Sequence, residues 1–228
     1  MSELLGLIVD TRPIQAHFRI PHSSLLLETY PFPPKTTAIG MIAGCMGFGE
    51  EEFLQLLREV KYGVIIEDPG ERIEEVSAIY KNPYSPSYPI TRVSLYKPRF
   101  RMFFLGEDEI IERAYEAIQD PVYVPYMGES ESLFYPHGKD FVEIVSVEEG
   151  EETTLRSVLP GDAKIKEFKP LRKRIQVPRM YEAPVDFIVK GKSRRAVYGR
   201  FIAYSGGFVE LEEPLKVMLF DGEPVFVF

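Results

Sequence analysis

The stretch from Tyr30 to Gly47 constrains the fold more than any other part of this sequence. It begins with closely spaced prolines, which force an extended entry, and then changes abruptly to helical spacing. Pro34 suits a first helical turn, because its missing N–H is one of the donors that a helix start leaves unpaired. Thr36 and Thr37 can cap the neighbouring donors. The stretch therefore predicts a helix that begins at Pro34.

The residues of this helix divide into two faces. Apolar side chains recur with the spacing of one helical face, while a second face carries almost no side chain. The apolar residues are Ile39, Ile42, Ala43 and Met46, and the glycines are Gly40, Gly44 and Gly47. The glycine face predicts a helix that lies very close to a sheet.

The start of the helix also suggests a phosphate site. Lys35 and Thr36 stand beside free backbone N–H groups and the positive end of the helix dipole. The alternative is an ordinary capped core helix. A nucleotide-binding P-loop does not fit, because prolines rather than glycines precede Lys35.

Composition narrows the class of protein. The chain has 228 residues, is 45% hydrophobic and contains no run of apolar residues long enough for a membrane helix. Its start lacks the pattern of a signal peptide, so we expect a cytoplasmic protein without membrane partners. Cys45 is the only cysteine, and the histidines are scattered, which predicts no metal site and no cofactor. The scarcity of asparagine and glutamine suggests a thermophile.

Charge is strongly segregated along the chain. The formal net charge is -8, yet residues 76–106 carry +5 and residues 163–204 carry +9. The intervening residues 107–162 carry -12. Two basic tracts in an acidic protein predict a localised surface for a polyanion. The alternative is that folding places the acidic tracts beside them and cancels the field.

The order of the elements predicts an α+β fold. Strand patterns occur at 4–18, 64–67, 75–80, 100–105 and between 140 and 147, and helical patterns surround Phe53 to Val60 and span Glu107 to Gln119. An acidic loop is expected at 148–152. Strand, helix, strand, strand, helix, strand is the order of a ferredoxin-like or RRM-like core.

Residues 81–101 predict a long arm. Tyrosines and prolines alternate here, and this density of proline forbids a helix, so an extended hairpin remains. Aromatic faces beside cations are what single-stranded RNA recognition uses, because bases stack on the rings while the cations hold phosphates. The alternative is a proline-rich loop that docks on a partner protein.

Two segments resemble the signatures of a known family. Tyr30-Pro-Phe-Pro-Pro-Lys-Thr-Thr-Ala-Ile-Gly40 and Pro121-Val-Tyr-Val-Pro-Tyr-Met-Gly-Glu-Ser130 look like those of the CRISPR-associated RAMP family that caps the crRNA 5′ handle in type I Cascade complexes. The resemblance covers roughly residues 4–147. It implies an RRM-like core with a thumb hairpin where residues 84–99 lie.

The resemblance also implies a function. Most members are not enzymes: they bind the 5′ handle of crRNA and contact the backbone and large subunits, in antiviral defence. One branch instead cuts precursor RNA without metal, and Tyr135, His137 and Lys139 would then be the catalytic set, with His137 as acid or base. A glycine-rich loop common in RAMP proteins has only a poor counterpart, Ser205-Gly206-Gly207.

These observations lead to a division of the chain and a set of candidate RNA contacts. We expect an RRM-like domain at 1–150 and a small, basic, antiparallel β appendage at 151–228. The other alternative is a ferredoxin-like scaffold that binds only protein. The candidate RNA-binding residues are His17, Arg19, His22, Lys35, Thr36, Lys81, Tyr84, Tyr88, Arg92, Lys97, Arg99, Lys164, Lys166, Arg172, Lys173, Arg174, Arg194 and Arg195.

Overall fold

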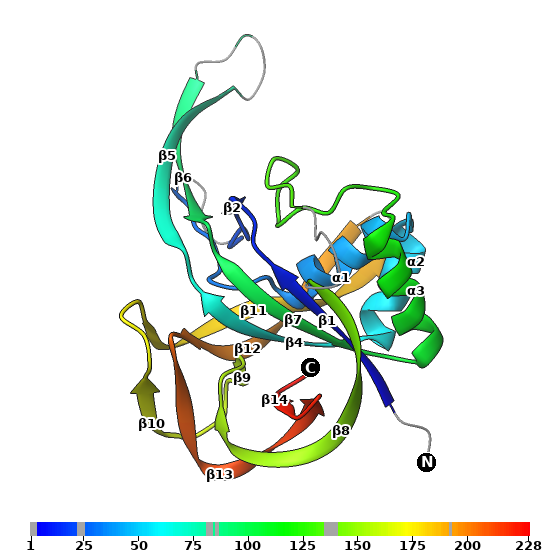
Figure 1. Ribbon diagram of the computed structural model, residues 1–228. Helices are drawn as coiled ribbons and strands as arrows, with labels where there is room; N and C mark the ends of the chain where they lie inside the picture. The colour runs from blue at the N-terminus through cyan, green and yellow to red at the C-terminus, as the bar shows by residue number, and fades with distance from the viewer. Residues whose placement is uncertain (1–3, 22–25, 81–83, 85–86, 135–140, 192) are drawn as a thin grey trace.

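The computed structural model describes residues 4–21, 26–80, 84, 87–134, 141–191 and 193–228. It shows a strand-rich mixed fold built on one curled sheet (Figure 1). Four strands make the centre of this sheet: β1 (Leu4–Thr11), β4 (Lys61–Asp68), β7 (Arg99–Leu105) and β8 (Val142–Leu155). They lie in the order β8-β1-β7-β4, and every neighbouring pair is antiparallel. The predicted strand at 4–18 is therefore two elements, because β1 ends at Thr11.

Three helices cover one face of the central strands. These are α1 (Lys35–Cys45), α2 (Glu50–Glu59) and α3 (Asp108–Gln119). The sequence pattern predicted all three helices, and the acidic first turns of α2 and α3 suit the helix dipole. Alternate strand residues such as Val9, Val64 and Met102 point toward the helices and are fully buried, so this face holds the main core.

The start of α1 differs in detail from the prediction. Pro34 precedes the helix, and no side chain caps its first turn. The glycine face does not approach the sheet: a Cβ atom on Gly40 would lie 3.6 Å from Phe53 of α2, and one on Gly44 would contact nothing within 4 Å. The helix instead buries residues all around its axis, which explains why it is more apolar than α2 or α3.

The opposite face of the sheet is covered by the C-terminal strands. β8 curves away from β1 and pairs with β13 (Gly207–Phe220), which pairs in turn with β10 (Ile165–Pro170) and β14 (Glu223–Val225) (Figure 1). The predicted boundary at 150/151 lies inside β8, so it does not separate two sheets. The predicted acidic loop at 148–152 is also wrong, because these residues pair with β13.

A long hairpin projects from one corner of the molecule (Figure 1). It consists of β5 (Glu71–Tyr80) and β6 (Ser87–Tyr96), which pair without a register shift. β2 (Gln15–Ala16) and β3 (Leu26–Leu27) pair with the body end of β6. The predicted arm at 81–101 had the wrong limits, because its first limb begins at Glu71 and the second ends before Arg99.

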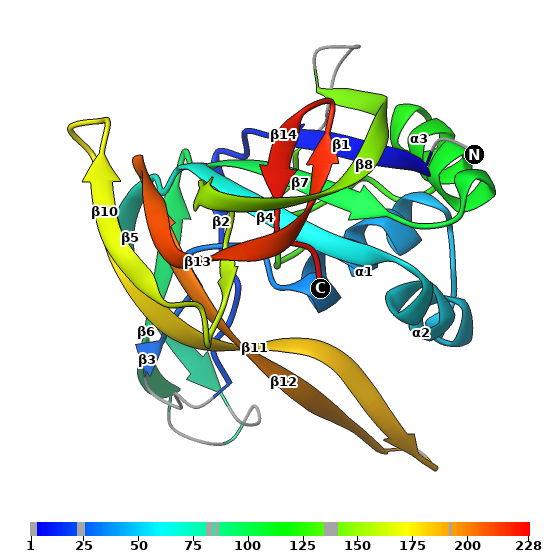
Figure 2. The same ribbon diagram turned by 90° about the horizontal axis from the view of Figure 1, so that it is seen from below.

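A second long hairpin extends beneath the helices (Figure 2). It joins β11 (Gln176–Lys190) to β12 (Ser193–Ser205), and β9 (Leu159–Pro160) pairs with β12. The ring of Phe187 on β11 packs against Phe53 of α2 at 6.3 Å between centroids. Strands were expected in both limbs, but this packing against α2 was not.

Among the described residues, no helix is long and apolar enough to span a membrane. The end of α1 contacts the segment 121–130, since the N–H of Val122 donates to the carbonyl oxygen of Cys45 at 2.9 Å.

Candidate nucleic-acid interface

Acidic and basic chain segments meet where the β5–β6 hairpin leaves the sheet. Asp68 at the end of β4 is paired in register with Arg99 at the start of β7, and Glu71 at the start of β5 faces Tyr96 of β6. The carboxylate of Asp68 also accepts the N–H of Gly70 at 2.9 Å, which closes the turn between β4 and β5. Strand pairing therefore fixes one acidic and one basic segment side by side.

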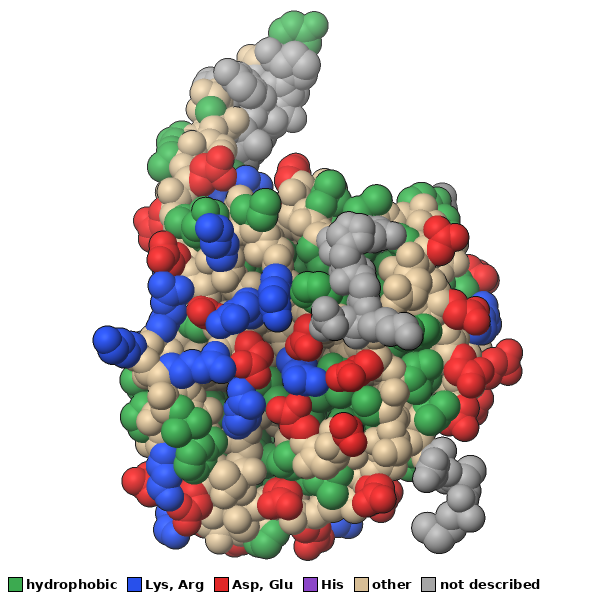
Figure 3. Space-filling view, in the orientation of Figure 1, with side chains coloured by type: hydrophobic (Ala, Val, Ile, Leu, Met, Phe, Trp, Pro, Cys, Tyr) green, Lys and Arg blue, Asp and Glu red, His purple; other side chains and the backbone are tan. Residues whose placement is uncertain are grey.

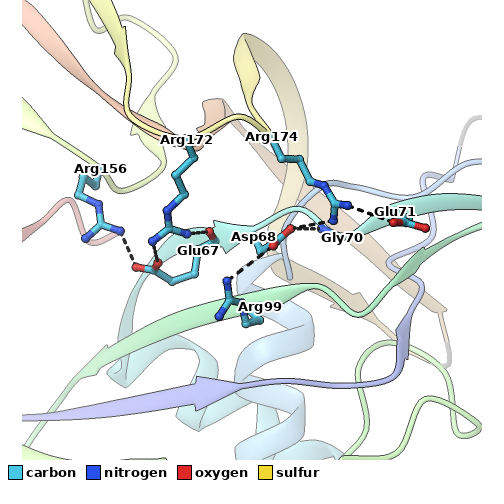
Figure 4. Close-up of polar contacts among 8 residues, drawn as sticks. All are labelled: Glu67, Asp68, Gly70, Glu71, Arg99, Arg156, Arg172 and Arg174. Carbon is cyan, nitrogen blue, oxygen red and sulfur yellow. Dashed lines mark hydrogen bonds and ion pairs between the residues drawn. The ribbon is translucent and has the colours of Figure 1, made fainter.

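The loop 171–175 brings further arginines to the same place (Figure 4). The carbonyl oxygen of Gly206 accepts the N–H groups of Leu171 at 2.8 Å and Arg172 at 3.0 Å. Gly206 has a φ of +74°, and a Cβ atom there would collide with the carbonyl oxygen of Arg174. The glycine pair that appeared to be a poor RAMP loop therefore holds the arginine-bearing loop by close backbone contact.

Ion pairs connect these segments, and we call the seven charged residues the arm-base cluster. Arg172 binds the carboxylate of Glu67 at 3.0 Å and also its carbonyl oxygen. The contacts of the other arginines are Arg156 with Glu67 at 2.6 Å, Arg174 with Glu71 at 3.0 Å and with Asp68 at 3.4 Å, and Arg99 with Asp68 at 3.6 Å (Figure 4). The cluster consists of Glu67, Asp68, Glu71, Arg99, Arg156, Arg172 and Arg174.

The two basic tracts of the sequence converge in this cluster. Arg99 belongs to the tract at 76–106, Arg174 belongs to the tract at 163–204, and both contact the carboxylate of Asp68. One arginine of the first tract and two of the second therefore meet here, and they do so around carboxylates. The arginine side chains stay accessible, because those of Arg99, Arg172 and Arg174 are 47%, 47% and 51% exposed.

The cluster and its neighbours carry a positive excess. Lys97 and Lys173 adjoin it in sequence and are exposed, and the described residues give neither a carboxylate partner. Lys97 lies over the ring of Tyr96 at 5.0 Å. Glu223, 3.6 Å from Arg156, is a fourth carboxylate, so with these lysines there are six cations and four carboxylates, an excess of two positive charges. Figure 3 shows Lys and Arg side chains gathered below the projecting hairpin, with Asp and Glu among them. Such a surface attracts phosphates.

The sheet face on which RRM domains stack bases is not available here. Ile8 of β1 and Phe103 of β7 point to this face but are 2% and 0% exposed, because Phe220 of β13 and Val225 of β14 pack over them. Beyond this core, Arg101 lies 3.0 Å from Glu143 and 3.4 Å from Glu223. Burial raises the pKa of Glu223. This face of the sheet is therefore closed to a nucleic acid.

Several predicted residues lie on the β5–β6 hairpin itself. Tyr84 and Tyr88 are 95% and 43% exposed. Arg92 pairs with Glu75 and with Glu129, both at 2.7 Å, and these contacts raise the pKa of its guanidinium. Lys81 lies outside the described residues, as does His22.

The prediction of an RNA contact at His17 is wrong. The ring is 1% exposed, and its Nδ1 donates to the carbonyl oxygen of Val93 at 2.6 Å. Its Nε2 has no hydrogen-bond partner and lies 3.8 Å from the carboxylate of Glu129. His17 directly follows β2, and its side chain belongs to the packing at the hairpin base. Arg19 forms an antiparallel bridge with Thr29, and its side chain is exposed.

The predicted phosphate site at the start of α1 is also not supported by the geometry. Thr36 is only 9% exposed. The Nζ of Lys35 donates to the carbonyl oxygen of Phe228 at 2.9 Å, and burial lowers the pKa of this amine. Thr36 is therefore largely buried, and Lys35 joins α1 to the residues after β14.

The remaining predicted cations lie at two other places. Lys164 precedes β10 and contacts Glu213 at 3.4 Å, and Lys166 lies in β10 and contacts Glu210 at 2.6 Å. Arg194 and Arg195 lie near the tip of the β11–β12 hairpin, and Arg194 stacks on Phe187 at 4.5 Å and approaches Glu50 at 3.5 Å. These residues do not join the arm-base cluster.

Tyr135, His137 and Lys139 lie outside the described residues. No group of three or more potential metal ligands occurs in the described part of the chain.

Sequence reasoning missed Arg156 and the three carboxylates of the arm-base cluster. Arg156 lies within the acidic tract 107–162, so the tract sum concealed it. The residues Asp68-Pro69-Gly70 are readable in the sequence as a turn. A signal existed in its position, since an acidic turn directly before the arm must lie at the base of the arm.

Comparison with known proteins identifies the relatives of this chain. The profile of the family described as CRISPR-associated protein (Cas_Cas5) matches residues 17–186. Among curated proteins, none matches the sequence closely enough to count as a relative.

Solved structures share the fold at low sequence identity. A "CRISPR RNA-guided surveillance complex" chain is 14% identical with a TM-score of 0.57, and the match covers 91% of each chain. A CRISPR protein from Archaeoglobus fulgidus is 14% identical with a TM-score of 0.53 over 98% of each chain. A third, described as a Cas protein, is 15% identical with a TM-score of 0.52, covering 91% of this chain and 95% of the other.

Proposed function

Because the chain belongs to the CRISPR-associated Cas5 family, we propose that it is the subunit of a type I interference (Cascade) complex that binds the 5′ handle of crRNA. In this role it joins the backbone subunit to the large subunit and is not an enzyme. The order β8-β1-β7-β4 supports a ferredoxin-like core as the frame of this subunit.

One observation carries the proposal: arginines from both basic tracts meet at Asp68, at the base of a projecting hairpin. RNA-binding surfaces need cations that are close together, exposed and fixed in position. The arm-base cluster supplies them, because each arginine is oriented by a carboxylate and still keeps about half of its surface accessible. Arginine forks match phosphate and carboxylate geometry equally well, so RNA phosphates can share or replace the carboxylate contacts.

The hairpin supplies the second component of an RNA site. Tyr84 and Tyr88 expose rings on which unpaired bases can stack, and each such contact is worth about 1–3 kcal/mol. Since the sheet face is covered by β13 and β14, we place the RNA strand along the hairpin and across the arm-base cluster, not on the sheet.

The proposal is tested by measuring affinity for RNA that contains the repeat sequence, by fluorescence anisotropy across a series of salt concentrations. We expect an affinity that falls as salt rises, with a slope of about -0.7 per phosphate contacted. If the chain has no affinity for RNA, or an affinity that does not change with salt, the proposal is contradicted and the scaffold that binds only protein is favoured.

The same RNA separates binding from cleavage. We expect it to remain intact during incubation in EDTA, because the proposed role is non-catalytic. Clean cutting that disappears in His137→Ala would overturn this part of the proposal and identify a metal-independent endoribonuclease.

A further inference from the structure

A second exposed surface is apolar, whereas the arm-base cluster is charged. We call residues 121–134, which follow α3, the apolar loop. Five of its large apolar side chains are between 45% and 64% exposed: Val122, Tyr123, Val124, Tyr126 and Leu133. Large apolar side chains that gather at the surface of a soluble protein mark interaction sites more often than single ones do.

The outward side chains of the apolar loop are presented by an ordered backbone. Tyr126 and Leu133 face each other in an antiparallel bridge. The N–H of Met127 donates to the carbonyl oxygen of Ser132 at 2.8 Å, and that of Phe134 donates to Pro125 at 3.1 Å. At 125–127 and 131–134 inward residues alternate with outward ones, and Met127, Ser132 and Phe134 are 1%, 4% and 8% exposed. The exposed residues are therefore not simply the outside of a loose loop.

The loop is also fastened to the body of the protein. Gly128 has a φ of +91°, and its backbone lies so close to the carbonyl oxygen of His17 that a Cβ atom would collide with it. The carboxylate of Glu129 binds Arg92 at 2.7 Å. A surface that is already ordered loses little conformational entropy on binding, which favours a docking role.

Charge distinguishes the partner that fits this surface. Residues 121–134 contain no lysine or arginine, and they contain Glu129 and Glu131, of which Glu131 is exposed. Asp120 at the end of α3 is exposed as well. RNA needs cations beside the aromatic rings on which it stacks, and this surface has carboxylates instead. Protein interfaces, in contrast, are enriched in tyrosine at an apolar centre with a polar rim.

We propose that the apolar loop is a docking surface for another protein subunit, whose contacting face is apolar and bordered by lysine or arginine. The proposal rests on the assembly role proposed above, but it does not require that this chain bind RNA. Tyr126 and Leu133 form the centre of the contact, since they lie opposite each other and the acidic residues lie beside them.

The test uses the complete complex, purified from cells that express all of its subunits and the guide RNA. Tyr126→Ser/Leu133→Ser removes the apolar centre, and Val177→Ser/Met180→Ser removes side chains of similar exposure, 49% and 53%, from β11. We expect the first variant to reduce the amount of this chain in the complex at least tenfold and the second to change it less than twofold. The single variant Tyr123→Ser, at a side chain that is 64% exposed, should reduce it severalfold without disturbing the fold.

Affinity of the isolated variants for repeat RNA is measured in parallel. Loss of assembly with unchanged RNA affinity supports the docking proposal. If the wild-type chain binds no RNA, that result contradicts only the proposed function, and loss of assembly in the loop variants still supports the docking proposal. Unchanged assembly in the loop variants overturns it. Equal losses in RNA affinity and assembly overturn it in favour of an RNA contact. Loss of self-association alone, measured by light scattering, overturns it in favour of a second copy of this chain.

Discussion

The arm-base cluster and the edge of the sheet formed by β10 and β13 differ in how their cations are paired with carboxylates. Both take cations from the basic tract at 163–204. At the β10 edge, Lys166 and Lys169 share Glu210 at 2.6 and 2.7 Å across paired strands, and Lys164 approaches Glu213. At the arm base, the cations come from three distant segments and outnumber the carboxylates.

This difference teaches that a basic tract is not in itself a basic surface. Lysines on a strand whose neighbour carries glutamates are neutralised locally, with one carboxylate nearby for each cation. Arginines that meet from separate segments accumulate charge, because no single neighbouring strand supplies all the partners. RNA affinity should therefore depend on the arm base and hardly on the β10 edge.

Removing arginines gives the largest expected effect. Arg172→Ala/Arg174→Ala should lower affinity for repeat RNA about 10- to 100-fold, since each of these half-exposed charge contacts is worth about 1 kcal/mol when lost. The slope of log affinity against log salt should decrease by about 1.4, as expected when contacts to two phosphates are lost. Lys164→Ala/Lys166→Ala is the matched control and should change affinity less than about threefold. Equal losses in both variants would end the distinction between the two regions.

The backbone support of the arginine loop gives the next largest effect. Gly206→Ala should lower the unfolding free energy by about 2–4 kcal/mol, because a side chain at positive φ is strained and its Cβ collides with Arg174. The melting temperature should fall by about 5–12 °C. Gly222→Ala is the control, since its φ is also positive, +79°, but no atom lies within 4 Å of the added Cβ.

The control should show only the conformational cost, about 1–2 kcal/mol. RNA affinity should fall in Gly206→Ala and not in Gly222→Ala. A shift of the same size in both variants would mean that the close contact with the arginine loop contributes nothing.

Neutralising a carboxylate should have a smaller effect of opposite sign. Glu67 binds both Arg156 and Arg172 and repels an RNA phosphate that approaches them. Glu67→Gln should therefore raise RNA affinity about two- to fivefold, since exposed charge interactions are worth about 1 kcal/mol or less. Glu210→Gln at the β10 edge should leave affinity unchanged. A decrease in affinity in Glu67→Gln would show that the carboxylate acts mainly to orient the arginines.

The smallest effect concerns pH. The ammonium groups of Lys166 and Lys169 lower the pKa of Glu210 to about 2. A carboxylate whose pKa is lowered by folding stabilises the protein above its unfolded pKa, and this contribution is lost as pH falls from about 4.5 toward 2. The melting temperature of Glu210→Gln should therefore fall less between pH 5 and pH 3 than that of the wild type, by a few °C at most. Identical pH profiles would contradict this.

The sequence by itself determined the local elements. Helical periodicity located α1, α2 and α3, because an amphipathic or apolar spacing at 3.6 residues per turn is readable without a partner. Proline density excluded a helix in the arm, and the two signature segments identified the family. It also located both basic tracts.

Only the tertiary structure decided where those tracts and their partners lie. The burial of His17, the pairing of Lys166 with Glu210 and the meeting of Arg99 with Arg174 depend on contacts between residues far apart in the chain. The curl of β8 through the predicted domain boundary likewise depends on pairing with β13. A net charge adds along the sequence, but an electric field adds in space, so only the packed chain shows which cations remain available to a ligand.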